Sequence, residues 1–327
     1  MEYVRLGSTG LKVSRICLGC MSFGSGSDWM VDGEAAKKVL KRAWDLGINF
    51  FDTANVYSKG RSEEILGDFL SGFRDEAVIA SKVNGEMGSR PNQRGLSRRH
   101  IMWQARESLR RLKTSYIDLY QIHRWDYETP IDETLSALTD LVKHDSVNYI
   151  GASSMWAWQF AKALYTSDLK GYARFVSMQD LYNLIYREEE REMIPLCRSE
   201  GVALLPWSPT AAGFLSGKYL QNGKLVTTEK NNTRVNPGSM GHTRYVGKPQ
   251  NDQIVSRVVE VAKNKGATPN QIALAWLLRK GVTSPIIGTS KVEHLEEMVD
   301  CINVKLTDEE AKYLEEPYSP QPTTGYT

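Results

Sequence analysis

The sequence predicts a (β/α)8 barrel, the TIM-barrel fold, formed by one domain that spans residues 1–327. Short apolar segments alternate with longer amphipathic segments along most of the chain, and this alternation is typical of parallel strands connected by helices. The apolar segments are nearly continuous, as expected for strands that are buried on both faces. Polar residues follow several of these segments, and a barrel carries its chemistry at the carboxyl ends of its strands.

Each element of the barrel has its own signal. A turn at Gly7-Ser8-Thr9-Gly10 predicts a β-hairpin over residues 1–15. The eight barrel strands are then predicted at residues 16–20, 48–52, 77–82, 117–121, 148–152, 175–178, 202–206 and 285–287. The helices are predicted at residues 34–46, 62–70, 97–112, 131–144, 156–165, 188–200, 253–265, 271–280 and 292–299. Gly47 suits the end of the first helix, and Ser97 suits the N-cap of the third.

One interval, residues 208–251 after the seventh strand, breaks this alternation. A connection of this length within a compact domain is uncommon and is usually functional. Against one acidic residue, Glu229, it carries the basic residues Lys218, Lys224, Lys230, Arg234, Arg244 and Lys248. We predict a long loop that folds over an anionic cofactor and becomes ordered when the cofactor binds. A tolerated surface insertion is the alternative.

Composition excludes several classes of protein. Hydrophobic residues make up 41% of the chain and charged residues 24%, which is ordinary for a globular protein. The formal net charge of +2 gives no special attraction to nucleic acid or to anionic membranes, so neither is expected as a partner. The first residues lack the order of a signal peptide, and no apolar segment approaches the roughly 20 residues that span a bilayer. A cytoplasmic protein is therefore expected.

The four cysteines predict neither a disulfide scaffold nor a metal site. Cys17 and Cys20 have the Cys-x-x-Cys spacing, but zinc would require further ligands, and Cys197 and Cys301 are isolated in the sequence. The first pair also continues an apolar segment, so the first barrel strand is the expected setting.

Four residues at or just after predicted strand ends form a set that can transfer protons: Asp52, Tyr57, Lys82 and His123. A phenol has a pKa of about 10, and an ammonium within about 4–6 Å lowers it. Lys82 can supply that charge, Asp52 can orient Lys82, and His123 can hydrogen-bond the oxygen of a bound carbonyl. None is an obvious nucleophile, so the set suits proton donation while a separate hydride donor attacks the adjacent carbon. Each residue taken alone fits a structural role equally well.

The segment Asp52-Thr53-Ala54-Asn55-Val56-Tyr57, followed by Gly60-Arg61-Ser62-Glu63-Glu64-Ile65-Leu66-Gly67, resembles the signature of the aldo-keto reductase family. Ser81-Lys82 and Gln121-Ile122-His123 correspond to its next two catalytic positions in order and spacing. The resemblance extends over nearly the whole chain, and segments 121–126 and 182–187 are similar to the microbial aryl-alcohol dehydrogenase-like branch. It implies a barrel whose bottom is closed by the N-terminal hairpin.

The resemblance also implies that NADPH or NADP lies extended across the barrel mouth, although a Rossmann fingerprint is absent from the sequence. Trp207 corresponds to the aromatic residue on which the nicotinamide stacks. The other residues that correspond to the nicotinamide site are Gly19, Cys20, Met21, Asp52, Ser153, Ser154 and Gln179. The residues that correspond to the pyrophosphate loop are Ser208, Pro209, Thr210, Ala211, Ala212, Gly213, Leu215 and Lys218.

The adenosine end of the cofactor corresponds to a strand-to-helix junction at Gly288, Thr289, Ser290 and Lys291. Amides at a helix N-terminus favour phosphate, and the hydroxyls and the lysine suit the 2′-phosphate of NADP. Two positions depart from the family pattern: His294 stands where many relatives have Arg, and Met298, after Glu297, stands where many have Asn. These departures weaken the expected clamp on the 2′-phosphate and remove a hydrogen bond to adenine, so the expected preference for NADPH over NADH is shallow.

Aromatic residues near the predicted barrel mouth predict a mostly apolar substrate pocket lined by Phe23, Trp29, Trp125, Tyr127 and Trp156. Core or rim packing of these rings is the alternative. The predicted function is NADPH-dependent reduction of aldehydes or ketones to alcohols, with Tyr57 as the general acid. A sugar-phosphate-converting relative remains open. The alternative from another functional class is a cofactor-sensing subunit, such as the potassium-channel β subunits that share this fold.

Overall fold

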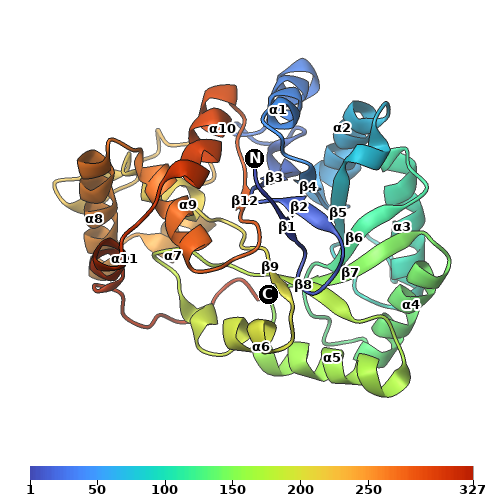
Figure 1. Ribbon diagram of the computed structural model, residues 1–327. Helices are drawn as coiled ribbons and strands as arrows, with labels where there is room; N and C mark the ends of the chain where they lie inside the picture. Colours follow the sequence, from blue (N-terminus) through green and yellow to red (C-terminus); the bar gives the residue numbers. More distant parts are fainter. Residues whose placement is uncertain (327) are drawn as a thin grey trace.

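A curled sheet of eight parallel strands forms the centre of the molecule, and helices surround it (Figure 1). The computed structural model describes residues 1–326 of the chain. Neighbouring strands are hydrogen-bonded in the order β12-β3-β4-β5-β6-β7-β8-β9. Their bounds are β3 (Cys17–Gly19), β4 (Phe50–Asp52), β5 (Val78–Val83), β6 (Ile117–Ile122), β7 (Val147–Ser153), β8 (Phe175–Gln179), β9 (Ala203–Leu204) and β12 (Ile286–Ile287). The predicted α/β barrel class is confirmed.

Backbone hydrogen bonds join the two edges of this sheet. The N–H of Thr283 donates to the carbonyl of Leu204 at 2.9 Å, and the N–H of Ile286 donates to the carbonyl of Pro206 at 2.9 Å. The short strands β9 and β12 therefore contact one another, and the sheet closes on itself. Closure satisfies backbone groups that an open sheet edge would leave unpaired.

The strand register determines which side chains meet at the carboxyl end of the barrel. Lys82 on β5 is level with Gln121 on β6, and Ser153 on β7 is level with Gln179 on β8. Asp52 is the last residue of β4, and its strand partner on β5 lies two residues before Lys82. Polar residues of five neighbouring strands are thereby gathered within one layer.

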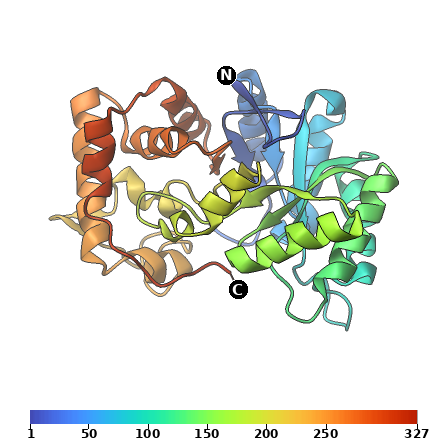
Figure 2. The same ribbon diagram turned by 60° about the horizontal axis from the view of Figure 1, so that its bottom comes forward.

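The helices lie outside the strands, as Figures 1 and 2 show. Their bounds are α1 (Gly33–Asp45), α2 (Arg61–Leu70), α3 (Arg98–Leu112), α4 (Ile131–Lys143), α5 (Ala157–Lys170), α6 (Met193–Ser199), α7 (Met240–Tyr245), α8 (Pro249–Lys265), α9 (Pro269–Arg279), α10 (Val292–Val299) and α11 (Asp308–Glu315). The predicted N-cap of α3 is confirmed, because the Ser97 hydroxyl accepts a hydrogen bond from the N–H of His100 at 3.3 Å.

The N-terminal hairpin closes the bottom of the barrel, as the family resemblance implies. Strands β1 (Tyr3–Arg5) and β2 (Lys12–Ser14) pair in antiparallel fashion. Leu6 and Val13 are completely buried against the first residues of several barrel strands. Gly7 has a φ of +58°, and a Cβ at this position would lie 2.6 Å from the carbonyl oxygen of Gly201, so the turn requires glycine.

The loop predicted after the seventh strand is present between β9 and α8, but it contains short regular elements that the sequence pattern did not predict. These are a two-stranded hairpin of β10 (Leu220–Gln221) and β11 (Lys224–Leu225), and the helix α7. Leu225, Val235 and Tyr245 are buried and attach the loop to the barrel. The two strands have two residues each and α7 has six, so these elements are too short to show a clear period in the sequence.

The single helix predicted over residues 188–200 is wrong. Glu188–Glu190 form one 3-10 turn, and α6 begins only at Met193. The reason is tertiary: the Glu188 carboxylate accepts hydrogen bonds from the Tyr318 hydroxyl and from the N–H of Gln321, both at 2.7 Å. These contacts come from the chain after α11, which returns to the barrel beside α5 and α6 (Figure 2).

Two buried carboxyl groups lie under the end of this returning segment. Asp180 accepts a hydrogen bond from the N–H of Ser154 at 3.0 Å, and its second oxygen has no partner within residues 1–326. Burial raises the pKa of Asp180 to about 7 against the opposing effects of Ser154 and the Arg124 charge. Burial and the neighbouring Asp180 raise the pKa of Glu189, whose carboxylate accepts from the Tyr326 hydroxyl at 2.7 Å.

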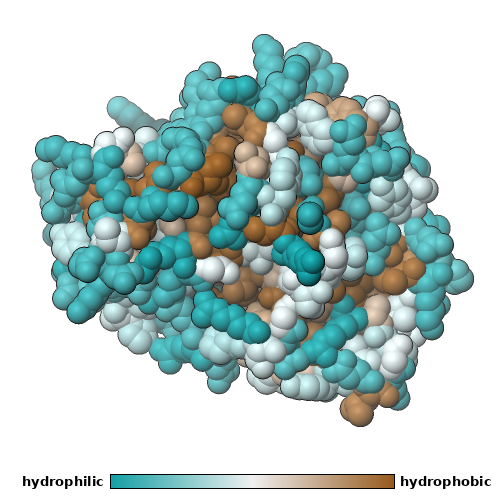
Figure 3. All heavy atoms as spheres, viewed as in Figure 1, coloured by the Kyte–Doolittle hydropathy of each residue, from teal (hydrophilic) through white to brown (hydrophobic). Residues whose placement is uncertain are grey.

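Hydrophilic residues cover most of the periphery on the face shown in Figure 3, and hydrophobic residues are concentrated towards its middle. Among the helices within residues 1–326, none combines the length and apolar character that a membrane span requires.

Asp180 generates a prediction about stability. Because its folded-state pKa of about 7 exceeds the ordinary carboxyl value of 3.8, the native state holds more protons than the unfolded state between these pH values. Rising pH therefore removes stability over this window. The parent should therefore lose free energy of unfolding between pH 4 and pH 8, and Asp180→Asn should not. The free energy of unfolding of Asp180→Asn relative to that of the parent, measured by urea denaturation, should rise by on the order of 4 kcal/mol over this range.

The matched control is Asp145→Asn, which changes an exposed aspartate. Its free energy of unfolding should follow that of the parent in parallel across the same pH range. If Asp180→Asn also runs parallel to the parent, Asp180 does not titrate as its burial predicts.

Candidate active site

The four residues predicted to transfer protons lie together at the carboxyl end of the barrel. Asp52 ends β4, Lys82 lies near the end of β5, and His123 directly follows β6. Tyr57 begins a 3-10 turn after β4, in which Ser58 has a φ of +46°. This left-handed backbone turns the chain sharply so that the phenol faces the lysine.

Lys82 is completely buried, and its ammonium group has three hydrogen-bond partners. Its Nζ lies 2.5 Å from Oδ1 of Asp52, 2.9 Å from the carbonyl oxygen of Thr53 and 3.2 Å from the Tyr57 hydroxyl. Burial by itself lowers the pKa of Lys82, but the charges and hydrogen bonds of Asp52 and Tyr57 outweigh it and raise the pKa. The lysine is therefore an ammonium throughout the neutral range.

The second oxygen of Asp52 is also hydrogen-bonded. It accepts from Nε2 of Gln179 at 2.8 Å and from Nε2 of Gln121 at 3.2 Å. The two amides are 3.4 Å apart, between Gln179 Nε2 and Gln121 Oε1. The carboxylate is thus held in one orientation by side chains from β6 and β8.

The electrostatic environment of Tyr57 differs from the expectation. Burial raises its pKa above the usual value, and although the Lys82 charge acts in the opposite direction, it does not overcome burial. The predicted net lowering of this pKa is wrong for the structure described. The sequence predicts a cation near the phenol, but it does not show how completely the fold buries the phenol, and burial has the larger effect on the pKa. The phenol is consequently protonated at neutral pH.

His123 lies edge-on to the Tyr57 ring, with 5.7 Å between the ring centroids. Burial lowers the pKa of His123 well below its usual value, and the charges of Lys82 and Arg124 lower it further. The imidazole is therefore neutral and can donate a hydrogen bond without contributing charge.

Behind this group lies a buried network that the sequence pattern did not single out. Oε1 of Glu63 on α2 accepts from the Ser81 hydroxyl at 2.5 Å, and Oε2 accepts from Nε of Arg111 at 2.6 Å. Gly60, the N-cap residue of α2, lies next to this arginine, and a Cβ there would lie 2.6 Å from Arg111 Cδ. The network fixes α2 and α3 against β5 and thereby supports the position of Lys82.

The structure brings the predicted nicotinamide residues together beside Asp52. The Ser153 hydroxyl donates to the carbonyl oxygen of Gln179 at 2.7 Å. Nε1 of Trp207 donates to the Ser154 hydroxyl at 3.0 Å, and Ser154 itself has a φ of +42°. Gly19 and Cys20 are buried at the end of β3, and Met21 is half-buried.

The predicted pyrophosphate loop forms a tight turn directly after Trp207. Its positive φ values occur at Ser208, Ala211, Ala212 and Gly213. The Ser208 hydroxyl accepts from the N–H of Ala212 at 3.1 Å, while Ala211 and Leu215 are buried. Pro209 and Thr210 lie within the same turn. Lys218 follows it and has no carboxylate oxygen within 4.0 Å among the described residues.

At the predicted adenosine end, Gly288 lies close to β3, since a Cβ there would be 3.9 Å from the Gly19 carbonyl oxygen. The Thr289 hydroxyl accepts from the N–H of Lys291 at 3.0 Å. Ser290 is half-buried, and Lys291 and His294 are exposed. Glu297 accepts from Asn270 at 3.1 Å, whereas Met298 is buried in the core.

The five predicted pocket aromatics do not share one environment. Phe23 is completely buried, and Tyr127 is 67% exposed. Trp29 and Trp125 are half-buried, and Trp156 contacts Tyr326 with their ring centroids 4.8 Å apart. The C-terminal segment therefore contributes to the rim of the mouth, which sequence reasoning missed because no local motif marks it.

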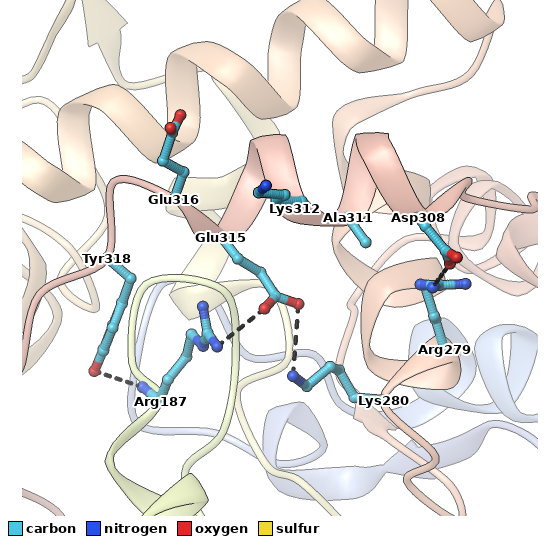
Figure 4. A pocket seen from close by; sticks show the side chains of 9 residues that line it. All are labelled: Arg187, Arg279, Lys280, Asp308, Ala311, Lys312, Glu315, Glu316 and Tyr318. Atoms are coloured by element: carbon cyan, nitrogen blue, oxygen red, sulfur yellow. Dashed lines mark hydrogen bonds and ion pairs between the residues drawn. The ribbon is translucent and has the colours of Figure 1, made fainter.

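A surface cavity of about 730 Å³ lies away from these residues (Figure 4). Arg187, Lys280 and Glu315 line it, and Glu315 forms ion pairs with both cations. None of the predicted site residues lines this cavity, and most of its charges are paired.

The comparison with known proteins agrees with the geometry. Residues 15–318 match the model of the Aldo/keto reductase family. The chain is 41% identical to the versiconal hemiacetal acetate reductase of Aspergillus parasiticus, over 98% of this chain and 98% of that protein. It is 42% identical to the aldo-keto reductase AMT2 of Alternaria alternata, over 99% of this chain and 94% of that protein. It is 39% identical to the putative aryl-alcohol dehydrogenase AAD16 of Saccharomyces cerevisiae, over 98% of each. The predicted resemblance is confirmed, and the chain belongs to the aldo-keto reductase family of oxidoreductases.

Proposed function

We propose that this protein reduces aldehydes or ketones to alcohols with NADPH, and that Tyr57 is the general acid. The observation that carries the proposal is the single buried ammonium of Lys82, which lies within hydrogen-bond distance of both Asp52 and the Tyr57 hydroxyl. An ion pair with a purely structural role does not require that the ammonium also hydrogen-bond a phenol. A phenol that acts as a proton donor does require a nearby cation, which stabilises the phenolate.

The residues present fit a nicotinamide dinucleotide. Lys218 and Lys291 have no carboxylate within 4.0 Å in the described part of the chain, so both are available for phosphate groups. Trp207 offers a half-buried indole, and the Ser154 hydroxyl retains a proton to donate because it accepts from the indole N–H. When bound, NADPH supplies the hydride.

The proton steps follow from the geometry of the side chains. His123, as a neutral imidazole, donates a hydrogen bond to the carbonyl oxygen and orients it toward Tyr57. The Tyr57 phenol gives its proton to that oxygen as charge develops there. The Lys82 ammonium stabilises the resulting phenolate at 3.2 Å, and Asp52 keeps the ammonium charged and in position.

The names of the relatives support a small carbonyl compound as substrate. One relative is named as a reductase of versiconal hemiacetal acetate and another as a putative aryl-alcohol dehydrogenase. Half-buried aromatic rings at the mouth suit substrates with an apolar portion.

The first test replaces the proposed acid. Tyr57→Phe should reduce NADPH consumption with aromatic and aliphatic aldehydes by roughly 10²- to 10⁴-fold, because only the proton donor is removed. The dissociation constant of NADPH, measured by fluorescence titration, should change less than threefold.

Tyr120→Phe is the matched control, because it removes another buried hydroxyl that has no hydrogen-bond partner among residues 1–326. Its turnover should stay close to that of the parent. Retained turnover in Tyr57→Phe would exclude Tyr57 as the acid.

The choice of NADPH is tested at the other end of the cofactor. Lys291→Ala should weaken NADPH binding about tenfold through loss of one charge-assisted phosphate contact, and should leave NADH binding nearly unchanged. An equal loss for both nucleotides would contradict a role in recognising the 2′-phosphate. Comparing both dissociation constants in the parent gives the size of the preference.

A further inference from the structure

The chain after α11 returns to the barrel as a segment without helix or strand (Figure 2). We call residues 321–326 the C-terminal strap. Its first residue, Gln321, is buried and fixed by its side chain. Nε2 of Gln321 donates to the carbonyl oxygen of Ile185 at 2.8 Å and to Oδ1 of Asn251 at 3.2 Å, and its Oε1 accepts from Nζ of Lys248 at 2.8 Å. One end of the strap is therefore attached to the chain after β8 and to the start of α8.

The other end of the strap is held by Tyr326. Its hydroxyl lies 2.7 Å from Oε1 and 2.8 Å from Oε2 of Glu189, and its ring is edge-on to Trp156 with 4.8 Å between the ring centroids. Between the two ends, the N–H of Thr324 donates to the Tyr186 hydroxyl at 3.0 Å. Glu189 is buried, and a buried carboxyl group requires hydrogen-bond partners. Tyr326 supplies that partner, so the strap and this carboxyl group stabilise one another.

Gly325 brings the backbone of the strap against the indole of Trp207. A Cβ at residue 325 would lie 3.1 Å from Cζ2 and 3.6 Å from Cη2 of Trp207. Gly325 also has a φ of +94°, which residues with a side chain rarely adopt. Glycine thus permits a close approach to the indole at this position, and any side chain would press on the ring.

The barrel holds the same indole through its nitrogen. Nε1 of Trp207 donates to the Ser154 hydroxyl at 3.0 Å, and the N–H of Ser154 donates to Oδ1 of Asp180 at 3.0 Å. The N–H of Trp207 donates to the carbonyl oxygen of Asp180 at 2.9 Å. Asp180 therefore acts on Trp207 from the barrel side, and Glu189 acts on it through the strap. Two buried carboxyl groups that take no part in proton transfer are thereby connected to one indole.

We propose that Tyr326 and Glu189 are positioning residues for the cofactor: their hydrogen bond closes the C-terminal strap on Trp207 and fixes the indole on which the nicotinamide stacks. The inference rests on the proposed function, which assigns the nicotinamide to Trp207. Ordering a mobile aromatic side chain on binding costs affinity, and a side chain that is already fixed avoids this cost. The strap supplies that order before the cofactor arrives.

The test measures the Kd of NADPH by fluorescence titration. Tyr326→Phe keeps the ring against Trp156 but removes the hydroxyl, and it should raise the Kd about fivefold, the size expected for one lost hydrogen bond. Gly325→Ala leaves the hydroxyl in place and should raise the Kd by a similar factor, because the added methyl group displaces the indole or the strap.

A double-mutant cycle with Trp207→Leu shows whether the strap acts through the indole. Trp207→Leu should itself weaken NADPH binding. In the Trp207→Leu background, neither Tyr326→Phe nor Gly325→Ala should raise the Kd further, because the indole that the strap positions is gone. The same fold-change in both backgrounds indicates a role in stability alone and overturns the proposal.

Tyr313→Phe is the matched control, because the Tyr313 hydroxyl donates to Glu260 at 2.7 Å on the exposed surface of α11. Its Kd should equal that of the parent. If Tyr326→Phe does not fold, as judged by circular dichroism, Gly325→Ala carries the same cycle.

The remaining outcomes separate this inference from the proposed function. An unchanged Kd in Gly325→Ala and in folded Tyr326→Phe overturns the positioning role, as does a parent that binds no NADPH. If the cycle gives the expected result but the parent reduces no aldehyde, the proposed reduction fails and the positioning role stands.

Discussion

The buried ion pair between Lys82 and Asp52 is the interaction on which the site depends. Removing two such charges from water costs several kcal/mol per ion unless their remaining hydrogen bonds are satisfied. Here Lys82 donates to Asp52, Thr53 and Tyr57, and the free oxygen of Asp52 accepts from Gln179 and Gln121. These groups come from β4, β5, β6, β8 and the turn after β4, so the barrel register and the ion pair require one another. Loss of either partner would leave an uncompensated buried charge.

The barrel mouth has the opposite electrostatic character. The interior charges of Lys82, Asp52, Glu63 and Arg111 are all paired within the fold. At the mouth, Arg124, Arg234 and Arg244 are half-buried without ion-pair partners in the described chain. Pairing inside holds the Tyr57 phenol in one position, whereas the cations at the mouth have no ion-pair partner among the described residues. Two of the three arginines belong to the loop between β9 and α8, and the third follows β6.

Periodicity was sufficient to predict the barrel, and three short segments at predicted strand ends were sufficient to predict Asp52, Tyr57, Lys82 and His123 as neighbours. Each of these signals is local. The features that were missed depend on contacts between distant residues: Asp28 with Thr233, and Glu188 with Tyr318 and Gln321. The latter contacts break the helix predicted over 188–200. The sign of the Tyr57 pKa shift was also missed, because a sequence shows which charges are present but not how deeply the fold buries them.

The central claim, that Tyr57 donates the proton while Lys82 stays charged, is tested most directly by the pH dependence of kcat/KM for aldehyde reduction. The raised pKa of Tyr57 and the raised pKa of Lys82 predict a nearly constant rate through the neutral range. The rate should then fall only at alkaline pH, above the ordinary phenol pKa of 10, where the proton donor is lost. A fall centred at or below neutral pH would contradict the claim, because neither the Tyr57 phenol nor the Lys82 ammonium loses its proton there.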